Sequence, residues 1–282
     1  METPLTDTHI EQLKQQVWKA LKSAGILTHP PENKFWQAWI VEEKARLQRT
    51  LLSTRPDPAV VSKVIDHTLL KPEAGKAQVH QVCQEAIDHG FASVCVNPVY
   101  VALVRTILQN HPVKTCCVVG FPLGAHTTAI KVSEAEQALK EGAQEIDMVI
   151  HIGALKDRDL VTLFQDIAAV VTVCDHHRSI CKVIIETALL EDEEKVMACE
   201  AAALAGAAYV KTSTGFSRGG ATVADVALMD RVVAPYRMGV KASGGIRDWS
   251  TALDMLKAGA VRIGASASVE IVTGAPTKGA DY

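Results

Sequence analysis

Three charged residues stand inside short apolar runs that have the length of β-strands. The runs are AYVKT for Lys211, GVKAS for Lys241 and EIDMV for Asp147. A charge inside a buried strand costs free energy unless it is paired or functional. One such residue would more often be a core ion pair, but three that fall near the same end of barrel strands, with the two lysines on neighbouring strands, predict a catalytic site.

The two lysines suggest the chemistry. A free lysine has a pKa near 10.4, so only about one in a few thousand is neutral at pH 7. An amine must be neutral to attack a carbonyl carbon. Desolvation and a second ammonium nearby both make protonation of an amine harder, so Lys211 and Lys241 together predict an activated lysine that forms an imine. Asp147 would then move protons, directly or through a water.

The elements that must position these residues alternate regularly from about residue 62. Eight β-rich runs are separated by segments that can be helical, several of which end at a glycine. We predict strands at Ile65–Leu70, Ala92–Val96, Lys114–Gly120, Glu145–Ile150, Cys181–Glu186, Tyr209–Thr212, Gly239–Ala242 and Val261–Ile263. Repeated strand–helix units imply parallel strands, and eight of them predict an α/β fold of the (β/α)₈ TIM-barrel type, with the active site at the C-terminal ends of the strands.

The main alternative fold is an open, doubly wound sheet. Such a fold typically has a glycine-rich dinucleotide-binding turn after the first strand, whereas the sequence there is LLKP. We therefore favour the closed barrel.

At these positions the chain resembles the deoxyribose-phosphate aldolase family, from about Val61 to Ser268. The resemblance rests on the stretches IDHTLLKP, VCVNP, EIDMV, KVIIET, VKTSTGF, VKASGGIR and RIGAS. It implies a TIM barrel in which Lys211 forms the Schiff base and Lys241 and Asp147 donate and accept protons. The implied reaction is reversible cleavage of 2-deoxy-D-ribose 5-phosphate into D-glyceraldehyde 3-phosphate and acetaldehyde, with neither metal nor cofactor. His151 departs from the pattern, since the family usually has asparagine there.

Substrate-binding residues are expected in the loops beyond the strands. Barrels often bind phosphate after strands seven and eight, where glycines let backbone N–H groups approach an anion. The residues that fit this place are Ser243, Gly244, Gly245, Gly264 and Ser266, and Thr214 and Gly215 offer a further donor after strand six.

Two residues nearer the strands leave alternatives open. Cys95 either lines the substrate or is a small buried residue. Asp66 either binds a substrate hydroxyl or holds Lys241 or a network at the barrel floor.

The two ends of the chain read differently from the barrel at residues 59–272. Residues 1–58 predict a helical hairpin, whose apolar face bearing Trp36, Trp39 and Ile40 should pack on the barrel or on another subunit. We therefore expect a homo-oligomer, a dimer or larger. Residues 273–282 predict a flexible tail ending in Tyr282, which is either a proton donor that reaches the site or part of a frayed end.

Composition excludes several classes of protein. The 282 residues carry a net charge of -3 without a basic block, which disfavours a nucleic-acid partner, and no apolar run is long enough for a membrane span. The first ten residues lack a signal-peptide core, so we expect a cytoplasmic protein. Seven cysteines without a CxxC pair predict reduced thiols and no metal site.

Two other functions remain open at this point. One is a Schiff-base aldolase that acts on a different sugar phosphate and would use a ketone donor. The other is a non-catalytic sugar-phosphate-binding barrel, which would be expected to lack Lys211, Lys241 or Asp147; all three are present.

Overall fold

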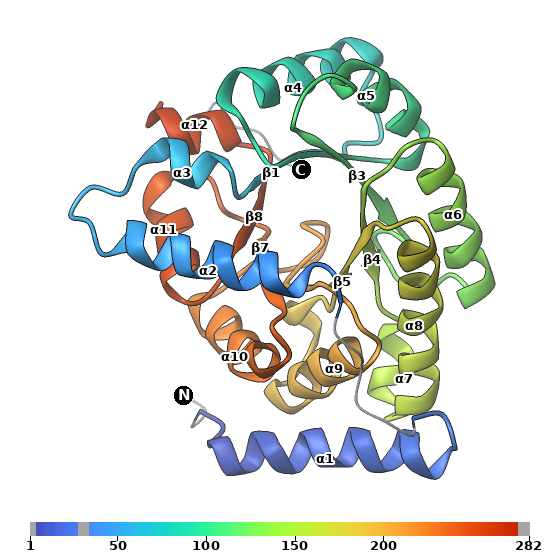
Figure 1. Cartoon of the computed structure of the whole chain (residues 1–282). Coiled ribbons are helices and arrows are strands. Elements are labelled where there is room, and N and C mark those ends of the chain that lie inside the picture. Colours follow the sequence, from blue (N-terminus) through green and yellow to red (C-terminus); the bar gives the residue numbers. More distant parts are fainter. Residues whose placement is uncertain (1–3, 28–33, 276–282) are drawn as a thin grey trace.

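The computed structural model describes residues 4–27 and 34–275. Eight parallel strands form a closed barrel in chain order, and β8 pairs with β1 (Figure 1). The strands are β1 Ile65–Leu69, β2 Ser93–Val96, β3 Lys114–Val119, β4 Glu145–Val149, β5 Ile180–Ile184, β6 Tyr209–Lys211, β7 Gly239–Ser243 and β8 Arg262–Ala265. The prediction of a TIM barrel is confirmed, and each predicted strand is found with its ends moved by two residues at most.

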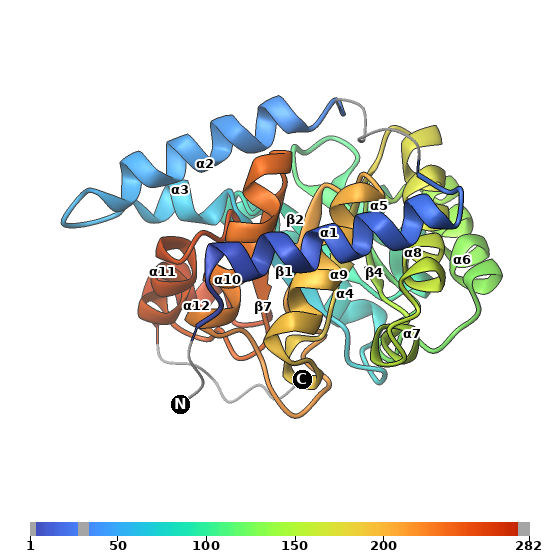
Figure 2. The same cartoon turned by 90° about the horizontal axis from the view of Figure 1, so that it is seen from below.

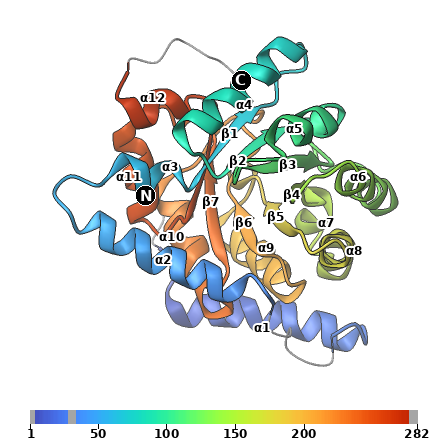
Figure 3. The same ribbon diagram turned by 45° about the horizontal axis from the view of Figure 1, so that its top comes forward.

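Helices connect successive strands and surround the barrel (Figure 3). They are α4 Lys76–His89, α5 Val101–Leu108, α6 Thr128–Lys140, α7 Ile152–Lys156, α8 Leu160–His176, α9 Asp192–Leu204, α10 Val223–Val233, α11 Trp249–Lys257 and α12 Ser268–Thr273. Local signals in the sequence end these helices: Gly259 follows α11 at φ +118°, and a Cβ atom there would lie 2.7 Å from the Asp230 carboxylate. A glycine is therefore required at this turn.

Apolar side chains fill the layer between the strands and the helices, as in other barrels of this kind. The inside of the barrel is different. A small apolar cluster there comprises Leu70, Cys95, Cys116 and Val118, and the remaining interior positions include many charged residues. The strand register explains how these charged residues gather. In neighbouring strands, Lys211 lies opposite Lys241, Lys241 lies opposite Arg262, and Asp147 lies opposite Lys182.

The N-terminal segment forms α1 Asp7–Ser23, α2 Gln37–Leu51 and the short α3 Pro58–Ser62. The expected hairpin is wrong in its arrangement: α1 packs along α8 and α9, whereas α2 packs against α11 and α3. Figure 2 shows α2 at one end of the barrel and α1 along its side. Most of the apolar face of each helix is buried on the barrel, as with Leu13 of α1 and Ile40 of α2, although Trp39 of α2 remains 42% exposed. The two helices therefore pack on the barrel and not against each other.

Among the described residues, no helix is long and apolar enough to cross a bilayer.

Candidate active site

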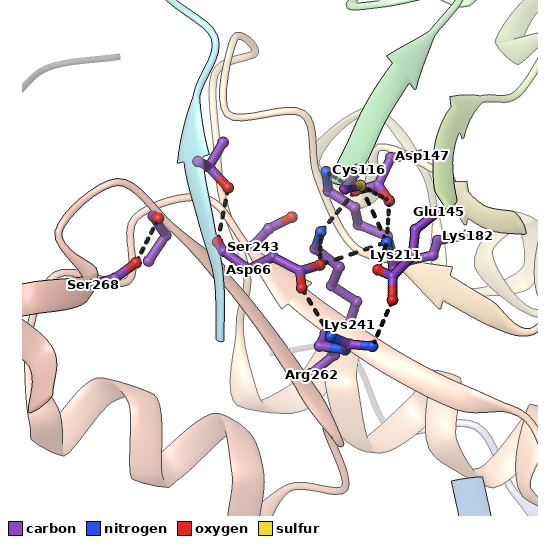
Figure 4. Close-up of polar contacts among 12 residues, drawn as sticks. Asp66, Cys116, Glu145, Asp147, Lys182, Lys211, Lys241, Ser243, Arg262 and Ser268 are labelled. Atoms are coloured by element: carbon purple, nitrogen blue, oxygen red, sulfur yellow. Dashed lines mark hydrogen bonds and ion pairs between the residues drawn. The ribbon is translucent and has the colours of Figure 1, made fainter. Parts of the chain in front are cut away.

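Asp147 lies between the two lysines that the sequence singled out. Its Oδ2 atom accepts hydrogen bonds from Lys211 Nζ at 2.9 Å and from Lys241 Nζ at 2.7 Å (Figure 4). Asp147 comes from the middle of β4, Lys211 ends β6, and Lys241 lies in the middle of β7. The barrel thus brings together three side chains that are far apart in the sequence.

Two more carboxylates and two more cations extend this cluster toward the N-terminal ends of the strands. Lys182 of β5 lies 2.7 Å from Asp147 Oδ1 and 2.7 Å from Glu145 Oε2. Arg262 of β8 donates to Asp66 Oδ1 at 3.0 Å and to Glu145 Oε1 at 3.2 Å. The other oxygen of Asp66 accepts from Lys241. Of the two alternatives for Asp66, the geometry matches the one in which it holds Lys241 and a network at the floor.

The electrostatics of the cluster follow from these contacts. Burial raises the pKa of Asp147, but Lys182, Lys211 and Lys241 lower it more, so the pKa lies well below its usual value. Burial lowers the pKa of Lys241, but Asp147 and Asp66 outweigh it and raise that pKa above its usual value. Asp147 therefore rests as a carboxylate and Lys241 as an ammonium.

The cluster holds one cation more than it holds carboxylates. The anions are Asp66, Glu145 and Asp147, and the cations are Lys182, Lys211, Lys241 and Arg262. If Lys211 loses its proton, three anions face three cations. A buried cluster of balanced charge costs less free energy than one with an uncompensated charge, so loss of one lysine proton is the change that would balance this cluster.

Accessibility distinguishes Lys211 from the other two lysines. Lys211 is 3% exposed to solvent, whereas Lys182 and Lys241 are 0% exposed. Lys211 is also the last residue of its strand and has one carboxylate partner, while Lys182 and Lys241 each contact at least two. A substrate that enters from the C-terminal end of the barrel therefore meets Lys211 first.

The loops after β7 and β8 lie at the same end of the barrel as Lys211. Gly244 and Gly245 have φ angles of +89° and +78°, which suits glycine, and a Cβ atom on Gly245 would meet nothing within 4 Å. Within the described residues, the backbone N–H groups of Gly245 and Ser266 have no hydrogen-bond acceptor. These two groups remain candidates for binding an anion.

Two residues expected in the same phosphate site are already engaged. The N–H of Ser243 donates to Thr212 Oγ1 at 3.0 Å, and its hydroxyl donates to the carbonyl of Ser213 at 2.6 Å. Gly264 has a packing role, because a Cβ atom there would lie 2.9 Å from Lys241 Cε. Ser243 thus joins the ends of β6 and β7, and Gly264 leaves room for Lys241.

Thr214 and Gly215 form the start of the loop after β6. The hydroxyl and the N–H of Thr214 both donate to Glu186 Oε2, the latter at 3.2 Å. These two donors of Thr214 are therefore already used, whereas the sequence suggested that they bind phosphate. Burial raises the pKa of Glu186, although its bonds to Thr214 and the nearby Lys211 lower it. Glu186 has a left-handed backbone at φ +59°, an unusual conformation for a residue with a side chain, and it ties this loop to the end of β5.

Cys95 is fully buried inside the barrel, in the cluster with Cys116. A hydrogen bond with Cys116 lowers the pKa of Cys95, whereas burial raises the pKa of Cys116 well above its usual value. The Cys116 thiol lies 3.2 Å from Asp147 Oδ1. All seven cysteines are buried free thiols.

Two sets of potential metal ligands occur among the described residues, Cys95 with Cys116 and Asp147, and Asp66 with Cys116 and Glu145. Their carboxylates already bind lysine and arginine cations. A divalent ion at either place would face those ammonium and guanidinium groups and a protonated Cys116. The donor set therefore does not fit a metal.

Two residues named in the sequence analysis, His151 and Tyr282, are not part of this cluster as the structure describes it. His151 accepts a hydrogen bond at Nδ1 from the N–H of Ala154 at 3.1 Å and so caps α7. Tyr282 and the tail from residue 276 lie outside the described residues.

Sequence reasoning missed Lys182, Glu145 and Arg262 as members of the cluster, and Glu186 as the partner of Thr214. Lys182 carried the same signal as Lys211, since it lies within the apolar run ICKVI. Glu145 and Arg262 were not considered because catalytic residues were expected at the C-terminal ends of strands, and each of these two is the first residue of its strand.

Comparison with known proteins gives consistent matches. The model of the DeoC/LacD family of aldolases matches residues 60–275. The deoxyribose-phosphate aldolase of Clostridium tetani is 57% identical over 212 residues, which cover 75% of this chain and 97% of that protein. Deoxyribose-phosphate aldolase 1 of Bacillus licheniformis is 56% identical over 214 residues, or 76% of this chain and 95% of that protein.

A solved structure shares the architecture. The deoxyribose phosphate aldolase of Aeropyrum pernix, described as having a unique tetrameric structure, superposes with a TM-score of 0.75 at 32% identity. The match covers 81% of this chain and 96% of that one.

Proposed function

This chain belongs to the DeoC/LacD family of aldolases, and on that premise we propose that it reversibly cleaves 2-deoxy-D-ribose 5-phosphate to D-glyceraldehyde 3-phosphate and acetaldehyde through a Schiff base on Lys211. One observation carries the assignment of the lysine. Lys211 alone of the three clustered lysines retains exposed surface, at the C-terminal end of its strand, and the remaining charges balance when it is neutral.

The reaction begins when the neutral amine of Lys211 attacks the C1 aldehyde of the open-chain sugar. The carbinolamine that forms loses water to give an iminium ion. Lys241 and Asp147 assist by moving protons: Asp147 accepts hydrogen bonds from both lysines and lies 2.7 Å from Lys241 Nζ. The ammonium of Lys241 is the donor and the carboxylate of Asp147 is the acceptor.

The iminium ion then accepts electrons. Removal of the proton from the C3 hydroxyl turns C3 into the carbonyl of glyceraldehyde 3-phosphate, and the C2–C3 electron pair moves into an enamine on Lys211. Protonation of the enamine at C2 gives the methyl group, and addition of water to the iminium releases acetaldehyde and the free amine. The iminium of Lys211 supplies the electron sink, so this route needs neither a metal nor a cofactor.

The phosphate of the substrate is held by the loops after β7 and β8. The free N–H groups of Gly245 and Ser266 support this part of the proposal. Glu186 and Ser243 position the neighbouring loop and strand ends and do not bind the anion themselves.

Turnover assays test the substrate. The chain should cleave 2-deoxy-D-ribose 5-phosphate and, in reverse, should accept acetaldehyde as the donor while ketone donors react poorly. Turnover of a ketone donor with a longer sugar phosphate, and not of acetaldehyde, would favour the other Schiff-base aldolase. Binding of the sugar phosphate without any turnover would favour a non-catalytic barrel.

Assembly and location complete the proposal. We propose that residues 1–58 are an extension of the barrel, that the chain forms a homo-oligomer, and that Tyr282 in the tail at residues 273–282 donates a proton to the enamine. The tetrameric Aeropyrum pernix relative supports an oligomer. The seven buried free thiols suit a reducing compartment, which is the reason for proposing the cytoplasm.

A further inference from the structure

A cavity lies at the end of the barrel opposite Lys211. Its volume is about 660 Å³, and its walls include the first residues of four strands, Lys114, Glu145, Ile180 and Arg262. Lys211, in contrast, is the last residue of β6. The cavity therefore opens at the N-terminal end of the barrel, and its size is in the range of small-molecule sites.

Aromatic side chains from the N-terminal segment form one wall of this cavity. They are Phe35, Trp36 and Trp39, from the start of α2 and the residues before it. Trp36 is buried, but Phe35 is 63% exposed and Trp39 is 42% exposed. The family match begins only at residue 60, so this wall is an addition to the shared barrel.

Contacts with Tyr209 and Arg262 fix the orientation of the Trp39 side chain. Its ring lies edge-on to Tyr209 with centroids 6.3 Å apart, and the guanidinium of Arg262 lies 5.6 Å from each of the two ring centroids. The cation and the second ring hold Trp39 in place at the cavity. A rigid, partly exposed ring of this kind suits stacking on another planar ring.

The rest of the wall is positively charged. Lys63, Lys114 and Arg178 line the cavity with exposed side chains, and within residues 4–27 and 34–275 none of them pairs with a carboxylate. Glu145 is the acidic residue of the wall, and it is already bound by Arg262 and Lys182. The cavity thus presents several uncompensated cations beside exposed aromatic rings.

We propose that this cavity binds a small molecule in which a planar aromatic ring is joined to a phosphate group. The ring packs on Phe35 and Trp39, and the phosphate is held by Lys63, Lys114 and Arg178. A phosphate suits the three cations better than a carboxylate does, because it carries up to two charges and offers more acceptor oxygens. This site is separate from the Schiff-base chemistry and does not depend on it.

Titration calorimetry on the full chain tests the proposal, with adenosine 5′-monophosphate as the probe. Adenosine lacks the phosphate and inorganic phosphate lacks the ring, so each should bind at least about tenfold more weakly, the loss expected when one class of contact is removed. The variants Phe35→Ala and Lys63→Gln with Lys114→Gln should each weaken binding of the probe by a similar factor. The matched control is Lys19→Gln, an exposed lysine of α1 outside this cavity, which should change nothing.

The catalytic end must be excluded as the place where the probe binds. Lys211→Ala, saturated with 2-deoxy-D-ribose 5-phosphate, should bind the probe with unchanged affinity. Competition between the two ligands would overturn the proposal, as would probe binding that the Phe35 and lysine variants leave unaltered. Absence of binding at millimolar probe would also overturn the proposal, and a change of oligomeric state in Phe35→Ala would then show that another subunit covers the cavity.

Discussion

The Oδ2 atom of Asp147 is shared by two lysines from adjacent strands, Lys211 at 2.9 Å and Lys241 at 2.7 Å. A carboxylate in this place attracts both cations and so offsets the repulsion between them. It also joins the proposed nucleophile to the proposed proton donor, so that loss of any one of the three changes the protonation of the others.

Replacing Lys241 by Leu should move the pH–activity profile upward by at least about one unit. Without Lys241 the carboxylates Asp66, Glu145 and Asp147 face Lys182, Lys211 and Arg262, so the charges now balance when Lys211 is protonated. The rate of cleavage measured from acid to alkaline pH checks this. An unchanged profile in a correctly folded variant would show that charge balance does not control the nucleophile.

Placing a negative charge in the proposed phosphate site should affect phosphorylated substrate only. Ser266→Asp should raise KM for 2-deoxy-D-ribose 5-phosphate by at least about tenfold through like-charge repulsion. Cleavage of unphosphorylated 2-deoxyribose, which lacks the anion, should change little. The control Ser53→Asp lies on an exposed turn before α3 and should alter neither. Equal effects on both substrates would remove the phosphate from this loop.

Turnover should persist after treatment with EDTA. The carboxylates that could bind a metal within the described residues are bound by Lys182, Lys211 and Arg262, and the iminium makes an electrophilic metal unnecessary. Initial rates before and after dialysis against the chelator check this. A loss of activity that a divalent ion restores would place the reaction in the metal-dependent class.

A buried acid under α1 should make stability depend on pH. Glu200 of α9 accepts a hydrogen bond from the Tyr236 hydroxyl at 2.5 Å, and burial raises its pKa to about 7. The folded state therefore holds this proton more tightly than the unfolded state does, and its contribution to stability, present at acid pH, is lost as the pH rises through about 4.5 to 7.

Glu200→Gln should remove that dependence. At pH 8 the variant should be more stable than the parent by about 1 to 3 kcal/mol, and the difference should shrink toward pH 4. Chemical denaturation at a series of pH values measures it. Glu42→Gln, on the exposed face of α2, controls for loss of a charge. A difference that is the same at every pH would contradict a raised pKa at Glu200.

The barrel could be predicted from the sequence because its signals are local. Each strand is a short apolar run, and each predicted glycine stop, such as Gly259, is fixed by the backbone conformation of one residue. The catalytic lysines were also found locally, since a charge in an apolar run stands out. The clustering of Asp66 with Arg262 and of Glu145 with Lys182 is set by strand register around the closed barrel, which no single segment encodes.

Where the structure departs from these expectations, the causes are physical. Ser243 and Thr214 were expected to bind phosphate by their place in the loops, but their donors are used to hold strand and loop ends together. The hairpin was expected because two amphipathic helices follow each other in the chain. Both helices instead pack against helices of the barrel. Amphipathicity shows that a helix has an apolar face, but it does not show which element covers that face.

Reduction with borohydride in the presence of 2-deoxy-D-ribose 5-phosphate, followed by mass mapping of the modified peptide, tests the central claim most directly. Borohydride converts the iminium to a stable secondary amine at the lysine that formed it. The account predicts modification at Lys211, with none in Lys211→Ala although that variant folds. Modification at Lys241 or Lys182, or trapping that persists in Lys211→Ala, would contradict it.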